Sequence, residues 1–163
     1  MSMSRKIIWA LAILIALPLP AASASNSVKS TGSNGASISI SKSSYTKNSR
    51  VAVTGSGFDE TVGIYLAYCV MPKKNKIPTP CGGGTNKAGT GDASFWISSN
   101  PPPYGIDLAI PYTPGGRFKQ VVDVTKMIGK FDCRKVKCAI TVRSDHLREG
   151  DRSHDIFIPI SFK

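Results

Sequence analysis

The sequence predicts an all-β fold in which two sheets pack face to face. Short segments of alternating apolar and polar residues recur along the chain, and turn-forming residues separate them. The chain has 15 Gly and 11 Pro among 163 residues, which favours many turns over long helices. After the first 24 residues, no long window shows a sustained helical period. A hydrophobic fraction of 41% and a charged fraction of 19% are typical of one globular domain and exclude a large multidomain enzyme.

Residues 1–24 have the order of a secretory signal peptide. Arg5 and Lys6 precede an unbroken apolar run at 7–17, and Ala22-Ser23-Ala24 follows as a small-residue cleavage site. The run is shorter than the roughly 20 apolar residues that a membrane-spanning helix needs. We therefore predict cleavage near Ala24, no membrane span in the mature chain, and a protein that is secreted or associated with the cell wall.

Seven later segments are predicted as strands because apolar residues recur in them at a period of two. The polar, Ser- and Gly-rich stretch 25–35 precedes them and is expected to be a flexible leader. The folded domain is therefore expected to cover 36–163. Seven short strands in this length favour an immunoglobulin-like sandwich. The segments are 37–41, 51–54, 62–70, 93–98, 118–124, 138–143 and 155–162.

The alternation also predicts which side chains of each strand point into the core. In segment 62–70, Ile64, Leu66 and Tyr68 lie on one face and Tyr65, Ala67 and Cys69 lie on the other. Pro159 in the last strand implies an edge position or a bulge. Segment 93–98 puts Phe95 and Ile97 on one side and Trp96 on the other, and in segment 118–124 Phe118, Val122 and Val124 are expected to point inward.

Four cysteines in an exported chain are expected to form disulfides. Three pairings are possible, and the spacing favours Cys69 with Cys81 and Cys133 with Cys138. The second loop is so short that it should shape a turn between strands rather than add much stability. A zinc site made by all four cysteines would lack the close ligand pairs that such sites use.

The net charge of +11 falls to +9 when Arg5 and Lys6 leave with the signal peptide. A secreted protein of this charge is drawn to anionic surfaces. We consider cell-wall polymers, lipid headgroups and, through non-specific charge alone, nucleic acid. The alternative is a solvated basic surface that has no partner. The densest basic group, Arg134, Lys135 and Lys137, lies between two cysteines.

The segment 144–155 is the richest in polar chemistry, because it holds both histidines, His146 and His154, and four acidic residues. Carboxylates and imidazoles are able to bind a metal. Internal salt bridges with Arg148 and Arg152 are the favoured interpretation. A hydrolase that uses either histidine would need a nucleophile that the sequence does not identify. We expect no catalytic residue, no metal and no cofactor.

Several aromatic residues cannot all belong to one core face, among them Trp96, Tyr65, Tyr104 and Phe118. Aromatic side chains on strands and long loops can line a cleft for a flat ligand. The loops 71–92 and 99–117 are long enough to be functional rather than simple connections. The alternative is that Trp96 packs beneath one of these loops.

A pattern of residues centred on the cysteines comprises Gly55, Gly57, Phe58, Tyr65, Cys69, Cys81, Asp132, Cys133, Cys138, Ser144, Asp145, Ile160, Ser161 and Phe162. Together these residues resemble the neocarzinostatin family of small secreted actinobacterial apoproteins. The resemblance implies a seven-stranded immunoglobulin-like fold and the same two disulfides. In that family a cleft carries a reactive enediyne chromophore, and the first disulfide lies on its floor, which corresponds to Cys69 and Cys81. The chain departs from the family at Met71, in the insertion-like segment 99–117 and in its basic charge.

A weaker similarity, in Cys81 with its three glycines, the Trp96 segment, Asn100 with three prolines, and Asp145-His146, is to actinobacterial surface modules. Some of these modules accompany haem-uptake domains, but neither histidine of this chain matches a haem-ligating motif.

The leading hypothesis is a monomeric, non-catalytic module that carries or sequesters a small hydrophobic or aromatic ligand in a cleft beside the first disulfide. An envelope adhesion or structural module that binds anionic wall polymers is the alternative. The cleft is expected to be lined by Trp96, Tyr65, Phe118, Tyr104, Cys69 and Cys81.

Overall fold

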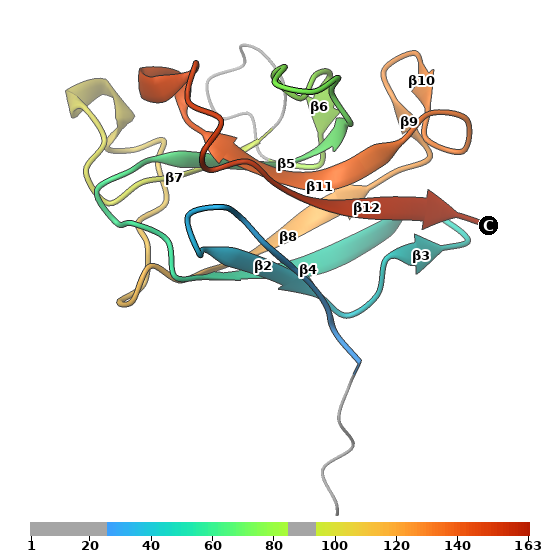
Figure 1. Cartoon of the computed structure of the whole chain (residues 1–163), viewed down its shortest axis with the longest axis horizontal. Helices are drawn as coiled ribbons and strands as arrows, with labels where there is room; N and C mark the ends of the chain where they lie inside the picture. The colour runs from blue at the N-terminus through green and yellow to red at the C-terminus, as the bar shows by residue number, and fades with distance from the viewer. Residues whose placement is uncertain (1–25, 85–93) are drawn as a thin grey trace, which may run out of the picture.

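Two β-sheets pack face to face in the computed structural model, which describes residues 26–84 and 94–163. The predicted signal peptide lies outside the described residues. In Figure 1 the strands β5, β11 and β12 form the upper layer, and β2 and β4 lie in the lower one. Among the described residues no helix is long and apolar enough to cross a membrane.

The first sheet has the strand order β1-β2-β4-β8 and the second has the order β3-β12-β11-β5-β6, with β7 also paired to β5. The first sheet consists of β1 (Val28–Thr31), β2 (Ser37–Ile40), β4 (Ser49–Ser56) and β8 (Phe118–Val124). The second sheet consists of β3 (Ser44–Tyr45), β5 (Ile64–Val70), β6 (Cys81–Gly82), β7 (Phe95–Ile97), β11 (Cys138–Ser144) and β12 (Ile156–Phe162). The hairpin β9 (Met127–Ile128) and β10 (Phe131–Asp132) and the 3-10 helices η1 (Pro103–Gly105) and η2 (His146–Arg148) complete the described elements.

The predicted all-β sandwich is confirmed, and each of the seven predicted segments contains a strand. Within the expected flexible leader 25–35, the described residues Val28–Thr31 form β1 and pair antiparallel with β2. Val28 packs against the core, and the backbone of this short edge strand bonds to its neighbour. Composition alone indicates a linker here because Ser and Gly outnumber the single apolar residue that anchors the strand.

The hydrophobic core lies between the two sheets and includes the row expected to point inward, Phe118, Val122 and Val124. Alternate residues of each strand point into it, as expected for two stacked sheets. The first sheet supplies Ile38, Ile40, Val51, Val53, Phe118, Val122 and Val124, and the second supplies Ile64, Leu66, Tyr68, Ile97, Ile140, Val142, Ile156, Ile158 and Ile160.

Both predicted disulfides are present, Cys69–Cys81 and Cys133–Cys138. The first joins β5 to β6, and the second closes the short loop between β10 and β11. Pro159 also lies as expected, because β3 pairs with Ser161 and Phe162 of β12 and, within the described residues, no strand pairs with Pro159 on that side. A residue without an N–H is tolerated at such a position.

Phe118 belongs to this core and contacts the backbone of the neighbouring strand. Its side chain is buried, and its ring lies 5.3 Å from the ring of Phe58. Gly55 on β4 is its register partner, and a Cβ at Gly55 would overlap the Phe118 ring. Gly55 therefore leaves the space that the Phe118 ring occupies beside β4.

We predict that Gly55→Ala destabilises the protein by about 1 to 3 kcal/mol, because the added methyl group overpacks the site of the Phe118 ring. Thermal and urea unfolding followed by circular dichroism measures the change. Gly150→Ala is the matched control, since a Cβ there meets no atom within 4 Å. Equal effects of the two substitutions would contradict the packing argument.

Candidate functional site

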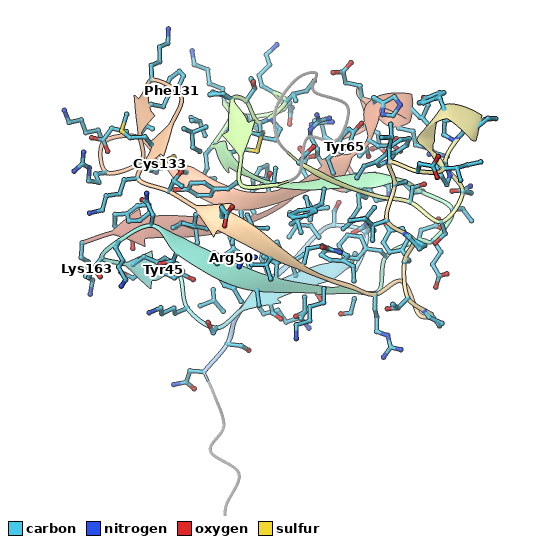
Figure 2. The ribbon with its side chains drawn as sticks, turned by 180° about the vertical axis from the view of Figure 1, so that it is seen from behind. Tyr45, Arg50, Tyr65, Phe131, Cys133 and Lys163 are labelled. Carbon is cyan, nitrogen blue, oxygen red and sulfur yellow. A yellow bond between two sulfur atoms is a disulfide. The ribbon has the colours of Figure 1, made fainter. Side chains whose placement is uncertain are left out.

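The outer face of the second sheet carries side chains from both ends of the predicted cleft. On β5, Tyr65 and Cys69 point away from the core, and Figure 2 shows Tyr65 on the side of β5 away from Arg50 of the first sheet. Trp96 is the register partner of Tyr65, and Cys81 is the partner of Cys69. Directly paired residues project on the same face of a sheet. The first disulfide and the Tyr65–Trp96 pair therefore lie at two ends of one face.

Small residues form the middle of this face. Ala67 pairs with Thr141, and Cys69 pairs with Ala139. The Thr141 hydroxyl lies 3.1 Å from Cys69 Sγ and 3.4 Å from the carbonyl oxygen of Ala67. All four side chains are buried. The face is thus buried near the disulfide, and its exposed contacts are at the aromatic end.

Four rings meet at that end, and we call Tyr65, Trp96, Tyr104 and His146 the aromatic cluster. The Tyr65 hydroxyl is 2.5 Å from Nδ1 of His146, and the Tyr104 hydroxyl is 2.7 Å from Nε2. The Trp96 ring meets the imidazole edge-on at 4.9 Å between centroids. A phenol hydroxyl can donate or accept, so a neutral imidazole is satisfied on both nitrogens in either tautomer. The bonds hold three segments of the chain together around one imidazole.

The cluster is buried at its base and exposed at its rim. Trp96 is 7% exposed, whereas Tyr104 is 61% exposed, and His146 is exposed beside it. The guanidinium carbon of Arg143 lies 4.9 Å from the centre of the Tyr65 ring. A cation at this distance is attracted to the face of the ring. The rim therefore offers ring faces, hydroxyl groups and one positive charge.

A buried carboxylate supports the base of the cluster. Asp145 is fully buried, and its Oδ2 accepts a hydrogen bond of 3.0 Å from Trp96 Nε1. Its Oδ1 accepts from the backbone N–H of Leu147 at the start of η2, also at 3.0 Å. A Cβ at Gly63 would overlap this carboxylate, so the glycine makes room for it. Since an unbonded buried carboxylate is costly, both donors are structurally important.

Tyr65 remains a hydrogen-bond donor at neutral pH. Burial first, and then the negative charge of Asp145, raise the pKa of the Tyr65 phenol above its ordinary value of 10.0. Arg143 opposes this rise. The phenol therefore keeps its proton well above neutral pH and can donate to His146 or to a bound group.

Phe118 lies apart from these residues, in the core on the first sheet. Sequence reasoning did not place His146, Asp145 or Arg143 in the site. The pairing of Arg143 with Tyr65 is what brings the end of β11 beside Tyr65. Tyr65 lies near the start of one predicted strand, and Asp145 comes just after another. These positions indicate that the two residues are close in space only when the two strands are known to be antiparallel neighbours.

The second histidine belongs to a separate polar cluster in the loop before β12. Its Nδ1 lies 3.2 Å from the Ser144 hydroxyl and 3.1 Å from an Asp151 carboxylate oxygen. In a Ser-His-Asp relay the hydroxyl and the carboxylate bond to opposite nitrogens of the ring. In this protein they share one nitrogen, so the arrangement is that of a structural hydrogen-bond cluster.

The expected internal salt bridge is present in the same loop, because Nη1 of Arg152 lies 3.3 Å from Oδ1 of Asp155. In the part of the chain that the structure describes, no group of three or more His, Cys, Asp or Glu side chains could hold a metal ion.

No protein-family model matches the chain, and no curated relative matches its sequence. Among solved structures, macromomycin is similar, with a TM-score of 0.48 and 12% sequence identity. The similarity covers 78% of this chain and 99% of the macromomycin chain. It is a distant likeness in structure.

We predict that Trp96→Phe lowers the free energy of unfolding by about 2 kcal/mol, because the Asp145 carboxylate loses a buried donor while the ring bulk is largely kept. Urea unfolding followed by circular dichroism measures the loss. Tyr104→Phe removes an exposed hydroxyl and is the control, with an expected loss within about 0.5 kcal/mol. A Trp96→Phe protein as stable as the control would remove Asp145 as an anchor of the cluster.

We also predict that part of the acid sensitivity resides in Asp151. Hydrogen bonds from the side chain and then the backbone of Ser153 lower the pKa of Asp151 from 3.8 to about 2. A depressed pKa contributes stability that is present above the unfolded value and is lost as pH falls. Stability should therefore decrease between about pH 4 and pH 2, and Asp151→Asn should flatten this decrease in unfolding curves. Asp107→Asn, an exposed carboxyl outside the cluster, should leave the slope unchanged.

Proposed function

We propose that the protein is an exported, non-catalytic binding module that holds a small flat ligand against the rim of the aromatic cluster. The main support is that both nitrogens of His146 are hydrogen-bonded to tyrosine hydroxyls, and that the Trp96 ring packs edge-on against the imidazole. The rings are therefore positioned before any ligand arrives, and a preorganised site loses less free energy on binding.

The chemistry of the rim supports a planar ligand with an acidic or hydrogen-bonding edge. Tyr104 and His146 are exposed rings, and aromatic rings favour offset stacking against another flat ring. Arg143 lies beside Tyr65 and supplies a positive charge for a carboxylate or similar group. The small buried residues toward Cys69 continue the same face, so the cluster is the exposed end of the face that contains the first disulfide.

A second candidate function, attachment to anionic wall polymers, is favoured by the basic residues around the second disulfide. Lys126, Lys130, Arg134, Lys135 and Lys137 lie on or next to the β9–β10 hairpin and the short loop. Of these, Arg134 is paired with Asp132 at 2.7 Å. Binding through such exposed charges decreases as ionic strength rises.

The two functions differ in their dependence on ring planarity and on salt. Naphthoate and its saturated analogue decahydronaphthoate carry the same charge, but only the first is flat. Trp96 is the single tryptophan outside the predicted signal peptide, so its fluorescence reports binding at the cluster. We expect naphthoate to bind and decahydronaphthoate to bind much more weakly, with little change at high salt. Tyr104→Ala should weaken naphthoate binding by about tenfold, since a stacking partner is lost.

Leu147→Ala is the matched control for this substitution, because Leu147 is exposed on η2 beside His146 but contributes no ring. Equal binding of the two ligands, or loss of binding with salt but not with Tyr104→Ala, would contradict the proposal and favour the envelope-polymer function. Native mass spectrometry of the protein purified from its host's secretions complements this test, since a retained mass would identify the natural ligand.

A further inference from the structure

Among the described residues, one edge of the first sheet is unpaired over part of its length. β8 is the last strand of that sheet, and β4 pairs with one side of it. On the other side, the backbone N–H of Asp123 donates to the carbonyl oxygen of Gly83 at 2.8 Å. Antiparallel pairing alternates, so residues two apart direct their N–H and C=O groups the same way. The backbone groups of Val121 and Lys119 therefore also point away from β4.

These backbone groups have no protein partner in the described part of the chain. Beyond the hydrogen bond between Asp123 and Gly83, neither Val121 nor Lys119 makes a backbone hydrogen bond on the side away from β4 within the described residues. An open stretch of two alternate residues presents two N–H donors and two C=O acceptors. This is the hydrogen-bonding edge on which an extended peptide can add as a further strand.

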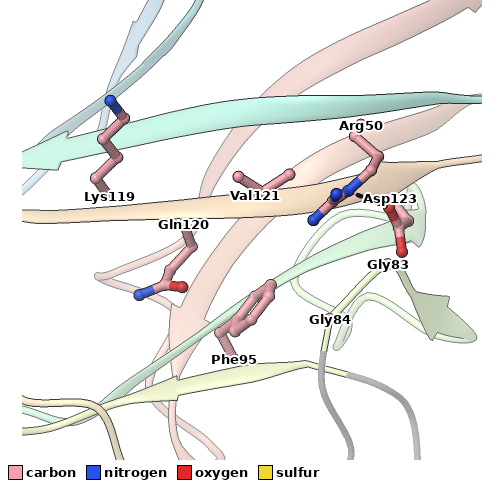
Figure 3. A pocket seen from close by; sticks show the side chains of 8 residues that line it. All are labelled: Arg50, Gly83, Gly84, Phe95, Lys119, Gln120, Val121 and Asp123. Atoms are coloured by element: carbon pink, nitrogen blue, oxygen red, sulfur yellow. Dashed lines mark ion pairs between the residues drawn. The ribbon is translucent and has the colours of Figure 1, made fainter.

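A pocket of about 480 Å³ lies along the open edge (Figure 3). Figure 3 shows Gln120 pointing from β8 toward Phe95 on β7, across the gap between the two sheets. Val121 is 38% exposed beside them. The lining residues are Arg50, Gly83, Gly84, Phe95, Lys119, Gln120, Val121 and Asp123. The pocket thus combines the open backbone edge with an aromatic ring that can receive an apolar side chain.

We propose that this edge pocket binds an extended peptide segment by strand addition to β8, with an apolar residue on Phe95 and an acidic residue beside Lys119. Side chains of an added strand alternate between the two faces of the sheet. The residue next to Gln120 would point inward onto Phe95, and its neighbour would point outward near Lys119. Lys119 has no acidic partner within the described residues, whereas Arg50 lies 3.7 Å from Asp123. The free cation therefore selects an acidic side chain at that position.

The site is separate from the aromatic cluster in position and in chemistry. The cluster lies on the outer face of the second sheet and binds through rings, whereas the edge pocket lies at the border of the first sheet and binds through backbone groups. Peptide binding at the edge pocket is therefore independent of ligand binding at the aromatic cluster.

The test uses the mature protein and the blocked peptide acetyl-Thr-Val-Leu-Glu-Thr-amide, followed by two-dimensional NMR of the backbone amides. We expect saturable shifts at Lys119 and Val121 and none at Tyr104 or His146. Two further peptides carry N-methyl groups at alternate positions, one at Val and Glu and the other at Leu. Only alternate residues of an added strand direct their N–H groups toward β8, so one of these peptides should lose binding and the other should keep it.

Val121→Pro is the decisive protein variant. Its lost N–H points away from β4, so the β4–β8 hydrogen bonds remain, and proline is tolerated on such an edge. We expect about a tenfold or larger loss of peptide affinity, since one hydrogen bond is lost and the ring obstructs the edge. Val121→Thr keeps the N–H and should bind as the parent does. Lys119→Glu should weaken the Glu peptide and strengthen a peptide with Lys in its place.

Three outcomes would overturn the proposal. The first is equal binding of the two N-methylated peptides, which would exclude a backbone ladder. The second is unchanged binding by a Val121→Pro protein whose circular dichroism and amide spectrum show the parent fold. The third is a concentration-dependent dimer that occupies the same amides without peptide, which would assign the edge to a second copy of this chain.

Discussion

The antiparallel pairing of β5 with β11 is the constraint on which both the core and the candidate site depend. Seven residue pairs connect the two strands. Their even-numbered residues, such as Leu66 and Val142, fill the core, and their odd-numbered residues, such as Tyr65 and Arg143, form the outer face. A shift of one residue in either strand would exchange its two faces and place Tyr65 or Arg143 between the sheets. The large apolar core therefore holds the site residues in register.

The buried Asp145 carboxylate converts this register into a fixed arrangement of rings. It lies directly after β11, bonds to Trp96 of β7 and caps η2, which carries His146. A carboxylate without water must keep its donors, so displacement of Trp96 or η2 carries a high cost in free energy. The exposed rim is also held in a fixed position, because the Tyr104 hydroxyl is hydrogen-bonded to His146. A ligand would thus meet rings that are already in place.

The two proposed binding surfaces use different features of the same sandwich. The aromatic cluster lies where 3-10 helices and loops extend beyond the strands, which is where binding residues commonly occur on rigid scaffolds. The edge pocket lies where a sheet ends. Edge strands have unpaired N–H and C=O groups, which can form hydrogen bonds with a strand of another chain. Lys119 restricts which chains can pair there, because a charged residue on an edge strand opposes non-specific association.

The sequence by itself determined seven of the twelve strands that the structure describes, their two-faced alternation and both disulfides, because each depends on residues that are close together in the chain. A period of two identifies segments such as 62–70 and assigns Phe118 to the core, and short spacing pairs Cys133 with Cys138. Only the tertiary structure decided which strands are neighbours, and therefore brought His146 to Tyr65 across a separation of 81 residues. It also added β1 to the sheet from a segment whose composition resembles a linker. Alternation records which face of a strand is apolar, whereas neighbour choice depends on how all apolar faces are buried together.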